Sequence, residues 1–172
     1  TYILQGVSRT FALTIPQLPP ALCKVVSNGY LLCRIADTIE DEPALTPAQK
    51  RQFSQQFIHV VAGDTNVDSF SQTLHPLLSH ATLATEKDLI LNAPRVIRLT
   101  HSFTPPQRAA LHRCIRIMAC GMAEFQQHSS LNGLKDLPEM NRYCYYVAGV
   151  VGEMLTDLFC DYSPQMAVHQ TS

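Results

Sequence analysis

The chain has 172 residues, of which 46% are hydrophobic and 16% charged, so it is long enough for one globular domain and too apolar for a disordered segment. Its 13 basic and 14 acidic side chains give a formal net charge of -1, which argues against a protein that binds nucleic acid through a broadly basic surface. No apolar run reaches the roughly 20 residues that a transmembrane helix needs.

Helix signals follow one another along the first half of the chain, and no run of alternating strand residues interrupts them. After a turn at IPQLPP, the periodicity predicts a long helix over 21–41, which ends before Pro43 because proline disfavours helical geometry at the preceding residue. A threonine N-cap followed by proline at 46–47 begins the next helix, and Gly63 is placed to end it.

The second half of the chain shows the same pattern. Further helices are predicted over three segments: 67–82, 85–101 and 106–128. Pro94 should bend or interrupt the second of these helices. The segment SSLNGLKDLP at 129–138 is the clearest connector, and a last helix is predicted over 138–159. The sequence therefore predicts an all-α domain.

The spacing of cysteine and histidine indicates neither a disulfide framework nor a zinc site. The six cysteines contain no CxxC pair and lie mostly in apolar helical runs, where free cysteine behaves as a small hydrophobic residue. The seven histidines form no HxxxH or HExxH motif. We therefore expect reduced cysteines and a cytoplasmic location.

The predicted helix over 21–41 carries a polar stripe on an otherwise apolar surface. At about 3.6 residues per turn, one face contains the residues at i, i+4, i+7 and i+11: Tyr30, Arg34, Asp37 and Asp41. Two carboxylates one turn apart can hold Mg²⁺ when substrate phosphates and water complete its coordination, and Arg34 can contact the same phosphate. A solvated helix end is the alternative, and this motif alone does not exclude it.

The predicted helix over 138–159 has a small, apolar face that carries one phenol. Its members are spaced as neighbours on one side of a helix: Tyr143, Val147, Ala148, Val151, Gly152 and Leu155. Gly149 and Gly152 each cost on the order of 1 kcal/mol relative to alanine inside a helix, so either close helix packing or an apolar channel should require them. A charged site beside such a channel suits a long hydrocarbon with a diphosphate head.

Four stretches of the chain, taken in order, resemble the squalene and phytoene synthases, which are head-to-head prenyltransferases of the isoprenoid synthase fold. These stretches are VSRTFA at 7–12, YLLCRIADTIED at 30–41, CGMAEF at 120–125 and YCYYVAGVVGEML at 143–155. The resemblance spans nearly the whole chain and implies an all-α helical bundle. The GMAEF stretch is more similar to squalene synthases than to phytoene synthases.

The resemblance implies roles for the acidic and aromatic residues. Asp37, Glu40 and Asp41 match the first aspartate-rich motif, whose carboxylates bind Mg²⁺ at the head group of farnesyl diphosphate. Tyr30 matches a family active-site tyrosine. Tyr143 matches the tyrosine assigned to proton removal or cation stabilisation in the first half-reaction. We therefore expect the catalytic residues to be Tyr30, Asp37, Asp41 and Tyr143.

The resemblance also implies which residues bind the substrate. The positions that hold diphosphate oxygens are matched by Ser8, Arg9 and Arg34. The positions that line the prenyl channel are matched by Phe11, Ala148, Val151 and Gly152.

The implied reaction is that of a squalene synthase. Two farnesyl diphosphates condense head to head in the presence of Mg²⁺ to form presqualene diphosphate, which NADPH then reduces to squalene. Two alternatives stay open. The first is phytoene or dehydrosqualene synthesis, which is also prenyltransferase chemistry, and the second is a non-catalytic all-α scaffold or interaction domain.

Residues 1–172 are expected to form one isoprenoid synthase domain that is truncated at both ends. The second aspartate-rich motif of the family lies a few dozen residues beyond the YCYYVAG stretch and is absent here, since Asp157 and Asp161 look like ordinary helix-end residues. Most of the NADPH surface is expected outside these residues, so the fragment alone should turn over little. Because squalene is insoluble in water, peripheral membrane association fits this reading, while the sequence does not indicate an oligomeric state.

Overall fold

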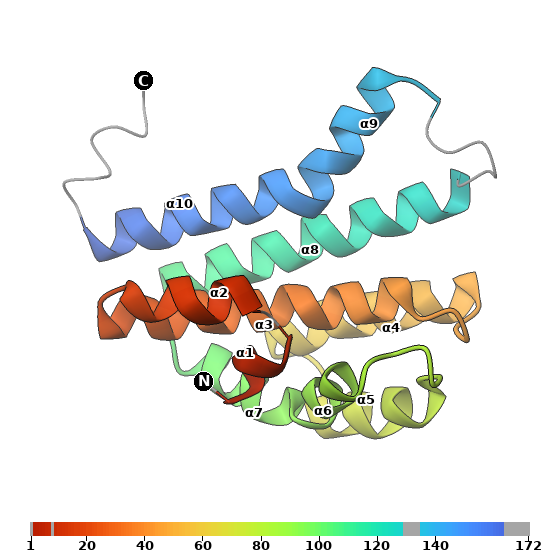
Figure 1. The fold of residues 1–172 in the computed structure, drawn as a ribbon, viewed down its shortest axis with the longest axis horizontal. Coiled ribbons are helices and arrows are strands. Elements are labelled where there is room, and N and C mark those ends of the chain that lie inside the picture. The colour runs from red at the N-terminus through yellow and green to blue at the C-terminus, as the bar shows by residue number, and fades with distance from the viewer. Residues whose placement is uncertain (1, 8, 129–134, 164–172) are drawn as a thin grey trace.

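The computed structural model describes residues 2–7, 9–128 and 135–163, and these residues contain helices and no strand (Figure 1). The elements are α1 (Tyr2–Val7), α2 (Arg9–Thr14), η1 (Ile15–Gln17), α3 (Pro20–Asp41), α4 (Pro47–Ala62), α5 (Val67–Leu74), η2 (His75–Leu77), α6 (Ala84–Leu91), α7 (Ala93–His101), α8 (Pro105–His128), α9 (Leu137–Cys144), η3 (Tyr145–Gly149) and α10 (Val150–Tyr162). The predicted all-α class is confirmed. Among the described residues, no helix is both long and apolar enough to cross a bilayer.

Helix α3 occupies the centre of the fold and packs against α4, α6, α7, α8 and α10. In Figure 1, α8 and α10 lie side by side along one edge of the molecule, while α5, α6 and α7 lie along the opposite edge. The apolar faces of α3 are completely buried at Leu32, Ile35 and Ile39, and Phe57 of α4 stacks on Phe70 of α5 within the same core. This burial fixes α3 firmly, so the polar stripe on its remaining face is held in a defined place.

The capping signals around α4 act as the sequence predicts. The Thr46 hydroxyl oxygen accepts a hydrogen bond from the Gln49 backbone N–H, and Gln49 Oε1 accepts one from the Thr46 backbone N–H, which completes a capping box. Gly63 ends the helix in the left-handed region with φ 98°, a conformation that favours glycine.

Three predicted helices differ in their bounds from the observed elements. The helix predicted over 67–82 is shorter, because α5 ends at Leu74 and Pro76 stands in the 3-10 turn that follows. The helix predicted over 85–101 is interrupted, as expected, and Pro94 lies in the first turn of its second part, α7. The last predicted helix is wrong as a continuous α-helix, since the π-helical segment η3 separates α9 from α10.

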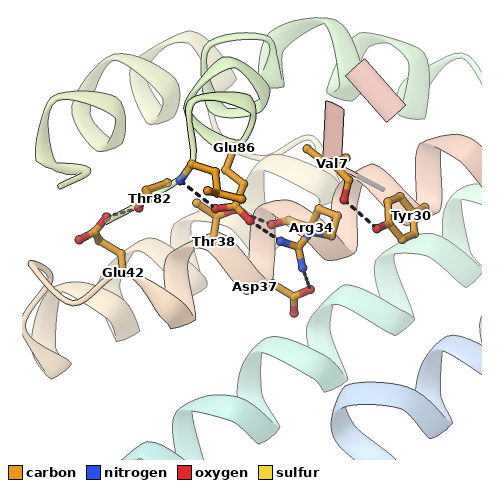
Figure 2. A network of polar contacts seen from close by, with 9 residues as sticks. Val7, Tyr30, Arg34, Asp37, Thr38, Glu42, Thr82 and Glu86 are labelled. Carbon is orange, nitrogen blue, oxygen red and sulfur yellow. Dashed lines mark hydrogen bonds and ion pairs between the residues drawn. The ribbon is translucent and has the colours of Figure 1, made fainter. Parts of the chain in front are cut away.

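A buried carboxylate joins the end of α3 to the segment that precedes α6. Glu42 is 1% exposed and accepts hydrogen bonds from the backbone N–H groups of Ala44 at 2.8 Å and Ser79 at 2.9 Å, and from the Thr82 hydroxyl (Figure 2). Burial acts to raise the pKa of Glu42, but these hydrogen bonds outweigh it and hold the pKa at about 2. The carboxylate thereby fixes the start of α6 relative to α3.

Candidate functional site

An apolar groove with a volume of about 440 Å³ lies between α2, α3, α8, η3 and α10. Its walls include several residues that the sequence had singled out: Phe11, Tyr30, Arg34, Asp37, Ala148, Val151 and Gly152. Most of the remaining lining is aliphatic or sulfur-containing and comes from Val26, Cys33, Met118, Met154 and Leu155. The groove is therefore apolar along most of its length and charged where Arg34 and Asp37 enter it.

The charged end of the groove is built around Arg34, whose side chain is 25% exposed. One guanidinium nitrogen, Nη1, donates to Asp37 Oδ2 at 3.1 Å, and the other, Nη2, donates to Glu86 on α6 (Figure 2). Arg34 Nε is buried and has no acceptor among the described residues. A buried donor without an acceptor costs about 1–3 kcal/mol, so an anionic oxygen at this place would be favourable.

Asp37 is held in an environment that is short of positive charge. Burial raises its pKa to about 6, and the Asp41 and Glu86 carboxylates add to this effect, whereas Arg34 opposes it. One arginine thus faces more negative charge than it can neutralise. A divalent cation placed beside Asp37 would relieve this imbalance.

Asp37 and Asp41 offer carboxylates one helical turn apart near the end of α3, with the half-buried Glu40 between them. Within the described ranges, no group of three or more possible ligands is arranged to hold a metal ion by itself. Mg²⁺ is commonly held by one or two carboxylates together with substrate phosphates and water. The two carboxylates therefore fit Mg²⁺ that binds together with a phosphate-containing ligand.

Tyr30 connects the first two helices to the groove. Its hydroxyl donates to the Val7 carbonyl at 3.2 Å (Figure 2). Its ring lies 5.0 Å from that of Phe11 between centroids. Ser8 lies outside the described residues. Arg9 begins α2, but its side chain also lies outside the described part.

Tyr143 lies near the acidic end of α3 and does not line the groove. Its ring meets Phe125 of α8 edge to face, with 5.3 Å between centroids. Burial raises the pKa of Tyr143, and the carboxylates of Glu40, Asp41 and Asp37 raise it further, so the phenol is near that cluster. The sequence predicted Tyr143 on one continuous helical face with the groove residues of α10, whereas the π-helical segment η3 stands between them.

The other pair of aspartates four residues apart makes structural contacts. Asp157 Oδ2 lies 2.9 Å from Arg113 Nη2, and Asp161 accepts a hydrogen bond from Gln107 at 3.0 Å. Both contacts join α10 to α8. Asp161 lies in the last turn of α10, as expected of a helix-end residue, whereas Asp157 lies in the middle of that helix.

Glu86 was not singled out from the sequence, although it binds the central arginine of the site. It lies 52 positions from Arg34, and no motif connects the two residues. The half-buried guanidinium required a carboxylate partner, but linear spacing does not show which one. The contacts of Tyr143 with Phe125 were missed for the same reason.

Comparisons with known proteins agree with this geometry. A family model described as squalene/phytoene synthase matches residues 4–172. Squalene synthases of Eremothecium gossypii and Dictyostelium discoideum are 30% and 31% identical to the chain, and each match covers 91% of it. The chain spans about a third of the length of these curated relatives, 34% and 35%. A solved complex of TcSQS with the ligand BPH1237 superposes with a TM-score of 0.78 at 25% identity, covering 96% of the chain and 45% of TcSQS.

Proposed function

Because the chain belongs to the squalene/phytoene synthase family, we propose that the protein is a squalene synthase. In this proposal it condenses two farnesyl diphosphates head to head to presqualene diphosphate and then reduces this intermediate with NADPH to squalene. The observation that carries the proposal is an apolar groove of about 440 Å³ that ends at Arg34 and Asp37. Such a groove fits a prenyl chain along its length and a diphosphate at its charged end.

The charged end would bind the diphosphate in two ways, through bound Mg²⁺ and through hydrogen-bond donors of the chain. Asp37, Glu40 and Asp41 would hold Mg²⁺, which, when bound, would stabilise the negative charge that develops on the leaving diphosphate. Arg34 would contribute the donor that has no acceptor among the described residues. Ser8 and Arg9 would complete the diphosphate contacts.

The groove would protect the reactive intermediates. Its lining of Phe11, Ala148, Val151 and Gly152 would exclude water, which would otherwise quench the allylic and cyclopropylcarbinyl cations to alcohols. The paired rings of Phe11 and Tyr30 would also stabilise positive charge through their faces. Tyr143, beside the acidic end of α3, would accept or hold the proton lost in the first half-reaction.

We further propose that these 172 residues are part of one longer isoprenoid synthase domain. The second aspartate-rich motif and most of the NADPH surface would lie outside them, so the segment alone would turn over little. The protein would act in the cytoplasm and associate peripherally with membranes, where squalene dissolves.

Product analysis of the full-length protein tests this proposal. It is incubated with farnesyl diphosphate and Mg²⁺, with and without NADPH, and the products are identified by gas chromatography. Squalene that forms only with NADPH supports the proposal. Dehydrosqualene as the final product with NADPH present, or phytoene from geranylgeranyl diphosphate, would favour the related syntheses, and no prenyl product would favour a non-catalytic scaffold.

A further inference from the structure

The π-helical segment η3 stands between the two parts of the site that come from the last helices. The groove residues Val147 and Ala148 lie within η3, and Val151 and Gly152 follow it on α10. Tyr143 precedes the segment on α9. A π-helical turn holds one residue more than an α-helical turn, which rotates the residues before it by about 100° relative to those after it. The segment therefore sets the direction of Tyr143 relative to the groove.

A ring on η3 is seated directly on the backbone of α8. A Cβ atom added at Gly121 would lie 2.1 Å from Tyr146 Cγ, and 2.5 Å and 2.6 Å from its two Cδ atoms. These three atoms form the rigid inner part of the ring, which cannot move unless the Tyr146 side chain changes its rotamer. If Gly121 served only close packing of the two backbones, its nearest neighbours would be backbone atoms of η3 instead.

The same contacts continue to Tyr143. The Tyr146 ring lies 6.0 Å from Phe125, and Phe125 lies 5.3 Å from Tyr143, both measured between centroids and both edge to face. The guanidinium carbon of Arg142 lies 5.8 Å from the centroid of the Phe125 ring, which is the middle ring of the three. A continuous row of aromatic rings thus runs from Gly121 to Tyr143, beside the acidic end of α3.

A second contact lies within the π-helical segment itself. A Cβ atom at Gly149 would lie 2.9 Å from Tyr145 Cδ2, so the Tyr145 ring lies over the last residue of the segment. Two successive tyrosines therefore each lie against a glycine, one within η3 and one on α8. Both tyrosines belong to η3, so the contact with Gly121 ties this segment to α8.

We propose that Gly121 and Tyr146 are positioning residues. The Tyr146 ring, seated on Gly121, holds the π-helical turn and, through Phe125, sets the direction of the Tyr143 ring. The effect on turnover rests on the proposed prenyltransferase function, whereas the effect on the orientation of Tyr143 does not. Neither residue needs to contact the substrate.

The activity test compares four variants of the full-length protein. Gly121→Ala should lower kcat at least about tenfold and should change kcat more than KM for farnesyl diphosphate, because the charged end of α3 is left intact and only the part of the groove that η3 supplies is disturbed. Tyr146→Ala should lower kcat similarly. The combined variant should be no worse than Tyr146→Ala alone, since the two residues act through one contact. Tyr146→Phe should keep wild-type kcat, because the ring rather than the hydroxyl makes the contact.

The orientation test needs no turnover. 3-Fluorotyrosine is placed at position 143 of the full-length protein without metal or substrate, and its ¹⁹F resonance is recorded. Gly121→Ala and Tyr146→Ala should both shift the resonance. Tyr146→Phe and the control Cys120→Ala, a change at an exposed neighbouring position on α8, should leave it unchanged.

Several results would overturn this inference. They are an unshifted ¹⁹F resonance in Tyr146→Ala, a Tyr146→Phe variant as impaired as Tyr146→Ala, and multiplied losses in the combined variant. If Gly121→Ala does not fold, the two Tyr146 variants still decide the question. If the wild-type protein forms no prenyl product, the proposed function fails, and the ¹⁹F comparison continues to test the positioning of Tyr143 separately.

Discussion

Replacement of Asp37 by asparagine should stabilise the metal-free protein at neutral pH, although it removes a proposed metal ligand. Burial raises the pKa of Asp37 from its ordinary value of 3.8 to about 6, against the opposing effect of Arg34. One pKa unit corresponds to about 1.36 kcal/mol. At pH 7, ionisation of Asp37 therefore lowers the free energy of unfolding by roughly 3 kcal/mol. Because 26% of the side chain stays exposed, we expect Asp37→Asn to raise the free energy of unfolding at pH 7 by about 1–3 kcal/mol.

The gain in stability of Asp37→Asn over wild type should increase as pH rises. The folded protein binds the Asp37 proton more tightly than the unfolded chain does, since the pKa is about 6 when folded and 3.8 when unfolded. Between these two values the folded state carries more protons, so the wild-type contribution to stability falls as pH rises. The variant lacks this titration. Its advantage should therefore be absent below about pH 4 and complete above about pH 6.

Urea denaturation in EDTA, at about pH 4 and about pH 7, measures this difference in the full-length protein. Asp68→Asn on α5 is the matched control, because Asp68 is exposed and the same chemical change there should give no stabilisation. Addition of Mg²⁺ with inorganic diphosphate should stabilise the wild-type protein more than Asp37→Asn. A variant that is less stable than wild type at neutral pH, or a gain that is equal at both pH values, would refute the reasoning.

Further outcomes are expected for three residues. Glu42→Gln should destabilise the protein by about 1–3 kcal/mol in urea denaturation, because an amide cannot accept all the hydrogen bonds that the buried carboxylate accepts. Wild type should lose the same stability as pH falls below about 4.5, since the folded pKa is about 2. Tyr143→Phe should lower turnover about 100-fold but keep the contact with Phe125, so its Tm should change little. Phe57→Ala should cost about 3–5 kcal/mol in chemical denaturation, because the ring is fully buried and stacked.

The sequence predicted those features that depend on local patterns. The helix over 21–41, its polar stripe and the capped start of α4 all follow from periodicity and from side chains that satisfy nearby backbone groups. The structure places Tyr30, Arg34 and Asp37 of that stripe in one groove with the small residues of α10. The polar wall and the small apolar wall of the groove could each be predicted from one segment, because the side chains of each wall follow the helical periodicity of that segment.

The features that the sequence did not predict depend on contacts between segments. The pairing of Arg34 with Glu86 joins α3 to α6, and no spacing rule connects them. The π-helical turn at η3 has no periodic signal of its own, since it is held by the Tyr146 ring against Gly121 on another helix. The direction of Tyr143 therefore followed from packing rather than from its position in the motif.

The measurement that tests the account most directly is calorimetric titration of the full-length protein with farnesyl thiodiphosphate, an analogue that ionises very slowly. The titration is made with Mg²⁺ and with EDTA, on the wild-type protein and on the Asp37→Asn, Asp41→Asn variant. Binding that requires Mg²⁺ and is lost in the variant is the predicted result, because the acidic end of α3 should bind the diphosphate through the metal. Equal binding with and without Mg²⁺, or undiminished binding by the variant, would contradict the assignment of this groove as the prenyl diphosphate site.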